Sequence, residues 1–149
     1  MSHPVKSIVI LMADDDADDR LLAKDALTEC RLANDLHFVE NGEDLMDYLR
    51  RRGKYKELQA PRPGLILLDL NMPKKDGREA LREIKTDAEL RKIPVVVLTT
   101  SKADTDVAQI YELGANSFIS KPVTFDSLVN VMNVLGNYWF GIVELPGKK

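Results

Sequence analysis

The sequence lacks the residues on which several protein classes depend. It has one cysteine among 149 residues, Cys30, which cannot form an internal disulfide, so a disulfide scaffold and a cysteine-rich zinc module are both excluded. Its two histidines, His3 and His37, leave little for a histidine-based metal site, and we assign no chemistry to these three residues. No apolar run approaches the roughly 18 to 20 residues of a membrane span, and the N-terminus has no signal-peptide pattern. We expect a cytoplasmic protein that binds no membrane.

Charge of neither sign dominates the chain. Lysine and arginine number 21 against 24 aspartate and glutamate, for a net charge of −3. Three consecutive arginines, Arg50 to Arg52, form the only notable basic run, which is typical of a solvated helix end, so we expect no direct contact with nucleic acid. The acidic residues concentrate early, with five aspartates between Asp14 and Asp19.

Short apolar runs recur along the chain, and stretches with helical spacing separate them. Their apolarity is continuous rather than alternating, which predicts strands buried on both faces of a sheet. Five such runs with a helix after each indicate an α/β fold of (βα)₅ type, a doubly wound parallel sheet with helices on both faces. The expected strands are Ile8–Met12, Leu36–Val39, Leu65–Leu68, Val95–Leu98 and Ser117–Ile119.

The expected helices follow Asp18, Asn41, Gly77 and Asp104, and the fifth spans about Phe125 to Tyr138. Residues 54–64 are interpreted as a long surface loop. The helical positions expected to face the core are Leu22, Ala26, Cys30, Leu45, Met46, Leu49, Ala80, Leu81, Ile84, Val107, Ile110 and Tyr111.

Polar side chains collect where the expected strands end, which is where ligands bind in open α/β sheets. Crowded carboxylates repel one another, and a divalent cation that prefers oxygen ligands, such as Mg²⁺, relieves the repulsion. A carboxylate can also accept a phosphoryl group. The pattern therefore gives each group a role: Asp69 as nucleophile, Asp14 and Asp15 as metal ligands, and Lys121 with the Thr99 hydroxyl as partners of the phosphoryl oxygens.

Four segments together resemble the receiver domain of two-component response regulators, over nearly the whole chain. They are the acidic pair in ILMADDDADDR, the segment LILLDLNMPKKDG around Asp69, the segment PVVVLTTS around Thr99, and the Lys-Pro pair in SFISKPV. The intervals of 30 residues from Asp69 to Thr99 and of 22 from Thr99 to Lys121 also match that family.

This resemblance implies a flavodoxin-like receiver fold with strand order 2-1-3-4-5. A histidine kinase would phosphorylate Asp69, with Mg²⁺ held by Asp14 or Asp15, by Asp69 and by the main-chain carbonyl of Asn71. The resemblance also implies that Thr99 and Phe118 move together as a switch and that the Lys121–Pro122 bond is cis. The residues 1–149 would form one receiver domain, with its core at about 6–138 and an aromatic extension at about 138–149.

A narrower resemblance is to the single-domain regulators that partner bacterial phytochromes, carried by LDLNMPKKDGREAL, RKIPVVVLTTS and the tail NYWFGIVELP. It implies a sensor histidine kinase of phytochrome type as partner, and output through protein contact or phosphoryl relay. Three consecutive aromatic residues, Tyr138, Trp139 and Phe140, cannot all point inward, so we interpret them as a surface for a homodimer or another partner.

Simpler interpretations stand beside these roles. Asp14 and Asp15 could merely open the first helix, where carboxylates complement the helix dipole, and Asp69 could cap a turn. For Asp16, Asp18 and Asp19 we favour capping or first-turn positions over ordering a metal-bound water. Thr100 is expected either at the site entrance or without a role.

Three other functions remain as alternatives. An aspartyl-phosphate phosphatase or phosphotransferase would need a second acid two residues after its nucleophile, where this chain has Asn71. A flavodoxin-like cofactor binder would need Gly, Ser or Thr in the loop that here carries aspartates. A binding-only pseudo-receiver is disfavoured because every expected site position is filled. We therefore expect a signalling switch rather than an enzyme.

Overall fold

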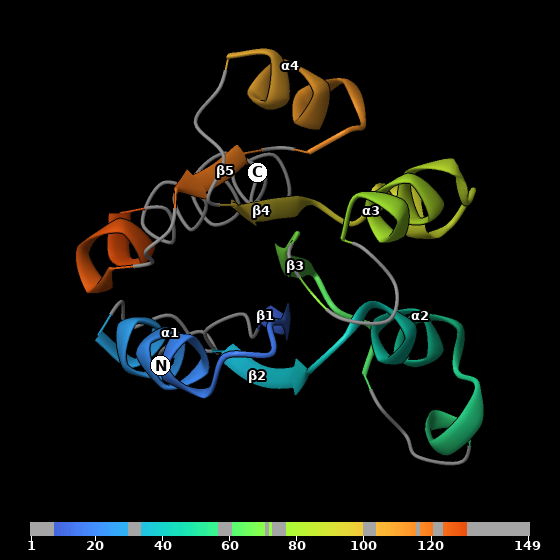
Figure 1. The fold of residues 1–149 in the computed structure, drawn as a ribbon. Helices are drawn as coiled ribbons and strands as arrows, with labels where there is room; N and C mark the ends of the chain where they lie inside the picture. Colours follow the sequence, from blue (N-terminus) through green and yellow to red (C-terminus); the bar gives the residue numbers. More distant parts are fainter. Residues whose placement is uncertain are drawn as a thin grey trace, which may run out of the picture.

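The computed structural model describes residues 8–29, 34–56, 61–70, 72, 77–99, 104–115, 117–120 and 124–130. Strands and helices alternate along it (Figure 1). The strands are β1 (Ile8–Ala13), β2 (Asn34–Val39), β3 (Leu65–Asp69), β4 (Val95–Thr99) and β5 (Ser117–Ser120). The helices are α1 (Ala17–Glu29), α2 (Gly42–Arg50), α3 (Gly77–Thr86) and α4 (Asp104–Glu112), with short 3₁₀ turns η1 (Gly53–Tyr55) and η2 (Leu90–Lys92) and a further helical stretch at 125–130.

All five strands join one parallel sheet in the order β2-β1-β3-β4-β5. The fold class and the strand order expected from the sequence are confirmed. Helix α1 and the 125–130 stretch lie on one side of the sheet, and α2, α3 and α4 lie on the other (Figure 1). Because all strands run the same way, their carboxyl ends share one edge of the sheet.

The sheet separates two apolar cores. Alternate residues of the central strands point to opposite faces, so Leu68 contributes to the core under α2 and α3 while its neighbour Leu67 contributes to the core under α1. All five residues of β3 and all five of β4 are buried. Burial on both faces explains why these runs are continuously apolar.

Most helix predictions are confirmed. Ala80, Leu81 and Ile84 of α3 are fully buried, and the Oδ1 of Asn41 accepts the backbone N–H of Asp44 at 2.7 Å as the expected cap of α2. Helix α2 ends at Arg50, so the basic run does lie at a helix end. Leu45 and Met46 are also fully buried, whereas Cys30 and the side chain of Val107 lie outside the described residues.

Three predictions need correction. Tyr111 was expected in the core but is 45% exposed, because Ile110 takes the inward position and successive helical residues point about 100° apart. Helix α1 begins at Ala17, before Asp18. The stretch expected to be a surface loop opens with η1, where Tyr55 is buried and its hydroxyl donates to the Asp44 Oδ2 at 3.2 Å.

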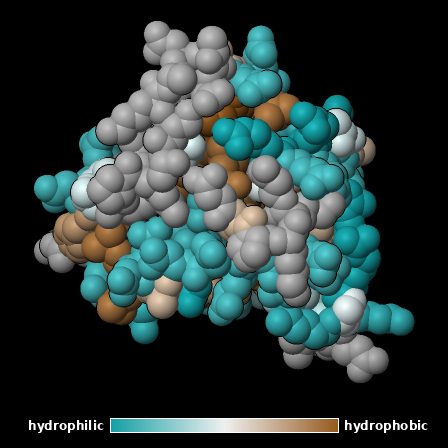
Figure 2. All heavy atoms as spheres, viewed as in Figure 1, coloured by the Kyte–Doolittle hydropathy of each residue, from teal (hydrophilic) through white to brown (hydrophobic). Residues whose placement is uncertain are grey.

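Few of the described residues expose a large apolar side chain. Among the described residues, the large exposed ones are Leu21, Tyr111 and Phe125. Figure 2 shows hydrophobic residues gathered at the left of the view, where α1 and the 125–130 stretch lie. None of the described helices is long and apolar enough to cross a membrane.

Candidate functional site

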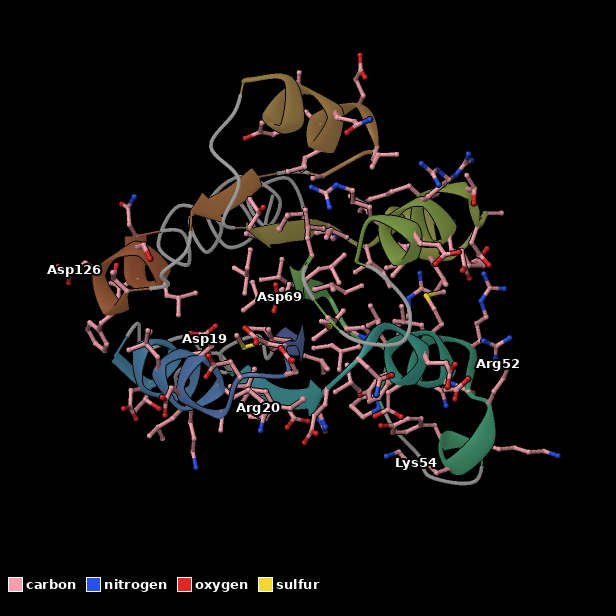
Figure 3. All side chains as sticks on the ribbon, in the orientation of Figure 1. Asp19, Arg20, Arg52, Lys54, Asp69 and Asp126 are labelled. Atoms are coloured by element: carbon pink, nitrogen blue, oxygen red, sulfur yellow. The ribbon has the colours of Figure 1, made fainter. Side chains whose placement is uncertain are left out.

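Three aspartates meet at the carboxyl edge of the sheet. Asp14 directly follows β1, Asp15 is next along the chain, and Asp69 ends β3, the neighbouring strand. One carboxylate oxygen from each lies within 4.8 Å of the other two. Asp14 and Asp69 are fully buried whereas Asp15 is exposed, so the cluster opens to solvent on one side. Figure 3 places Asp69 centrally, within the sheet.

Hydrogen bonds hold the turn between β1 and α1. The backbone N–H of Asp14 donates to the carbonyl of Val39 at 3.0 Å, which extends the pairing of β1 with β2. The Oδ1 of Asp14 accepts the backbone N–H of Asp16 at 2.9 Å. Asp16 in turn accepts the N–H groups of Asp18 and Asp19, at 2.8 and 3.3 Å, so it caps α1. The capping and first-turn positions expected for these aspartates are therefore confirmed.

Arg20 is a contributor that sequence reasoning missed. Its Nη1 donates to the main-chain carbonyl of Asp14 at 2.8 Å, and its Nη2 lies 3.8 Å from the Glu40 carboxylate. It therefore ties the turn that carries the aspartates to the end of β2 (Figure 3). Its role could have been suspected from its position, because it lies one turn into the helix that follows the acidic pair.

Gly77 is a second contributor that was missed. A Cβ atom there would lie 2.5 Å from the Cα of Leu70 and 2.6 Å from the carbonyl oxygen of Asp69, both backbone atoms. Its own N–H donates to the Leu70 carbonyl at 3.2 Å. Only glycine allows the start of α3 to approach the end of β3 this closely, so Gly77 helps set where Asp69 stands. The Asp-Gly pair ending LILLDLNMPKKDG was the visible sequence signal.

Thr99 lies beside this cluster. It ends β4, which pairs with β3 so that Asp69 stands opposite Leu98, and its side chain is buried at 1% exposure. On its other side Thr99 pairs with Ser120 of β5. Phe118 lies in β5, where its backbone pairs with Val97.

Several predicted site residues lie outside the described residues. They are Asn71, Thr100, Lys121, Pro122, Tyr138, Trp139 and Phe140. The structure therefore brings together Asp14, Asp15 and Asp69 at the ends of two neighbouring strands, and it places Thr99 at the end of β4, the strand on the other side of β3.

The donor set fits a divalent cation. Mg²⁺ takes oxygen ligands at about 2.0 to 2.1 Å in octahedral geometry, so opposite ligands stand about 4.2 Å apart. Three carboxylates whose oxygens lie within 4.8 Å need only small side-chain adjustments to meet that spacing. Two of them are buried and cannot rely on water to moderate their repulsion, which also favours a bound cation.

Comparison with known proteins decides the family. The response regulator receiver domain matches residues 10–133. The chain belongs to this family. A receiver-domain relative, response regulator Rcp1 of Synechocystis, is 41% identical over 145 residues, which are 97% of this chain and 96% of Rcp1.

Solved receiver structures agree in fold. The Mn²⁺-bound form of Rcp1 matches at 40% identity with a TM-score of 0.77, covering 89% of this chain and 94% of that one. The phosphorylated cyanobacterial phytochrome response regulator RcpA matches at 39% identity with a TM-score of 0.78, covering 91% and 95%. The receiver interpretation of the sequence is confirmed, including its likeness to phytochrome response regulators.

Proposed function

We propose that this receiver domain is a phosphorylation switch in which Asp69 accepts a phosphoryl group from a sensor histidine kinase. The observation that carries the proposal is the cluster of Asp14, Asp15 and Asp69 at the carboxyl edge of the sheet. In the transfer, a carboxylate oxygen of Asp69 forms a bond to phosphorus as the donor's nitrogen–phosphorus bond breaks, and the leaving imidazole keeps its electron pair and takes up a proton.

The chain's own residues divide the remaining work. Asp14 or Asp15 would supply an oxygen ligand for Mg²⁺, together with Asp69 and the main-chain carbonyl of Asn71. When bound, Mg²⁺ would neutralise charge on the phosphoryl oxygens. The Thr99 hydroxyl and the Lys121 ammonium are the proposed partners of those oxygens, and Phe118 follows Thr99 in the switch. Of Asp14 and Asp15, Asp14 is the buried one.

The kinase is proposed to be of bacterial phytochrome type. Support comes from relatives: RcpA is a cyanobacterial phytochrome response regulator, and the similar bacteriophytochrome response regulator RtBRR is 39% identical to this chain. We further propose that residues 1–149 act as one receiver domain in the cytoplasm, and that Tyr138, Trp139 and Phe140 form a homodimer or partner surface. The receiver match favours this switch over an aspartyl-phosphate enzyme or a cofactor binder, and the three clustered aspartates favour it over a pseudo-receiver.

Intact-mass spectrometry after incubation with acetyl phosphate and magnesium chloride tests the proposal. The purified chain should gain one phosphoryl group that hydroxylamine removes, and Asp69→Asn should gain none. Asp16→Asn is the matched control: it also neutralises one aspartate of the turn, and asparagine caps helices as well as aspartate does, so it should still be phosphorylated. Failure of the unsubstituted chain to gain the group, or equal gain by Asp69→Asn, would refute the proposal.

A further inference from the structure

A small cavity lies at the opposite edge of the sheet from Asp69. Its volume is about 140 Å³, and its walls come from the end of α2, the segment before β3, and η2. Asp69 ends β3 whereas residues 61–63 precede it, so roughly 13 Å of strand separates the cavity from the aspartate cluster. The lining residues are Tyr48, Leu49, Arg51, Pro61, Arg62, Pro63 and Leu90.

Hydrogen bonds fix the walls of this cavity in place. The Tyr48 hydroxyl donates to the carbonyl of Pro61 at 2.9 Å, and the Nη2 of Arg62 donates to the carbonyl of Glu89 at 2.7 Å. Arg51 caps the C-terminal end of α2 in the left-handed conformation, at φ 55 and ψ 51, with its N–H bonded back to the helix. The cavity is therefore built before any ligand arrives, which lowers the entropic cost of binding.

The volume suits one side chain. Pockets for cofactors and other small molecules span about 300 to 1,000 Å³. A cavity of about 150 Å³ accommodates a single benzene ring. Leu49, Pro63 and Leu90 give the cavity an apolar wall, whereas Tyr48, Arg51 and Arg62 bring polar groups to the rest of its lining, so the space suits an apolar side chain with charged neighbours.

The rim carries positive charge. Neighbouring cations have acidic partners: Arg50 lies 3.8 Å from both Glu83 and Asp87, and Arg52 lies 3.4 Å from Asp47. Arg51 has no acidic partner within 4.0 Å among the described residues. Arg62 shares Glu89, at 3.7 Å, with Lys92. Figure 3 shows Arg52 and Lys54 in this region beside α2, well away from Asp69.

We propose that this cavity, with Arg51 and Arg62 at its rim, is a docking site for an acidic segment of a partner protein that inserts one apolar side chain. Charge complementarity selects the occupant, because the two guanidinium groups meet carboxylates on either side of the inserted residue. The chain's own ends do not fit: residues 1–7 contain no acid, and residues 141–149 contain one acid and two lysines. The site is independent of the phosphorylation proposed above.

Fluorescence anisotropy with labelled peptides tests the docking site on the full chain. The probe is the acetylated peptide EEDLDEE, compared with EEDADEE, which keeps the charge and removes the apolar side chain. We expect EEDLDEE to bind about tenfold more tightly than EEDADEE. Arg51→Asn, in which asparagine tolerates the left-handed backbone, should weaken binding about fivefold, and adding Arg62→Gln should weaken it about tenfold or more.

Arg82→Gln is the matched control because it removes the same charge from an exposed position of α3 outside the cavity, and it should change binding less than about twofold. The proposal is overturned if EEDADEE binds as tightly as EEDLDEE, if Arg82→Gln weakens binding as much as Arg51→Asn, or if the chain binds no acidic peptide. Binding of a poly(dT) oligonucleotide through the same arginines, with no peptide binding, would assign the surface to nucleic acid instead.

Discussion

The two ends of the sheet use charge in opposite ways. At the carboxyl end, three carboxylates stand with oxygens within 4.8 Å of one another, and two of the three are fully buried. At the amino end, Arg50 and Arg62 lie near acidic side chains at 3.7 to 3.8 Å, on the surface. Gathered like charges oppose folding, whereas dispersed opposite charges are tolerated at little cost.

This contrast separates a region where like charges gather from a region where most charged side chains lie near opposite ones. Residues that destabilise a fold without an evident local gain are the expected mark of a functional site. The carboxyl end has that mark, and the loops of the amino end are secured by bonds such as that from the Tyr48 hydroxyl to the Pro61 carbonyl.

The largest effect is expected at the carboxyl end from Gly77→Ala. The added Cβ would meet the backbone of Leu70 and Asp69 at 2.5 and 2.6 Å, and backbone cannot rotate away as a side chain can. We expect a loss of about 2 kcal/mol in the free energy of unfolding and reduced phosphorylation of Asp69. Urea denaturation measures the first. Glu79→Ala, exposed in the same first turn, should stay within about 0.5 kcal/mol, and an equal loss there would remove the steric explanation.

Asp15→Asn tests the repulsion itself. Two unit charges about 4 Å apart repel by about 1 kcal/mol in water, so this exposed substitution should raise the free energy of unfolding by up to about 1 kcal/mol in chelator. The stabilisation that Mg²⁺ provides should shrink at the same time. Thermal unfolding with and without magnesium chloride measures both changes. A variant that is less stable in chelator yet fully stabilised by Mg²⁺ would contradict the account.

Arg50→Gln neutralises one charged side chain at the amino end, as Asp15→Asn does at the carboxyl end. Its contacts with Glu83 and Asp87 are long, at 3.8 Å, and its side chain is about one third exposed. Such surface pairs contribute about 0 to 1 kcal/mol, so we expect a loss near 0.5 kcal/mol that salt reduces further. Mg²⁺ stabilisation should not change. A loss above about 2 kcal/mol in denaturant unfolding would show that the amino end depends on charge more than we infer.

The last prediction concerns Tyr55, whose contribution to stability changes only at alkaline pH. Burial, and then the Asp44 carboxylate, raise the pKa of Tyr55 from 10.0 to about 12. Because the folded-state pKa is the higher one, the stability contributed by the neutral phenol is fully present below about pH 10 and is lost as pH rises toward 12. The free energy of unfolding should fall as pH rises across this range, and it should fall less steeply for Tyr55→Phe. Parallel curves for the two proteins would exclude Tyr55 as the cause.

The sequence predicted those features that depend on strand periodicity and strand ends. Continuous apolar runs identified all five strands, and because parallel strands end at one edge, Asp14, Asp15 and Asp69 could be expected together before any coordinates. Likewise Asn41 follows a general capping preference that depends only on its neighbours.

Features that depend on one particular side-chain or backbone contact could not be predicted in this way. Arg20 acts on a carbonyl six residues earlier, and Gly77 is required by the backbone of Leu70, a contact that spacing alone does not reveal. Tyr55 is buried because η1 folds back beside α2, where its ring lies 5.1 Å from that of Tyr48. Tyr111 shows the limit of helical periodicity: it lies at the edge of its helix's buried face beside the buried Ile110 and is exposed, whereas the adjacent Leu45 and Met46 of α2 are both buried.

The most direct test of the central claim locates the phosphoryl group. Borohydride reduction converts aspartyl phosphate to homoserine, so peptide mass spectrometry of the acetyl phosphate-treated protein identifies the modified residue. We predict homoserine at position 69 and at no other aspartate, and none when magnesium is chelated. Homoserine at Asp14 or Asp15 instead, or its formation in Asp69→Asn, would contradict the account.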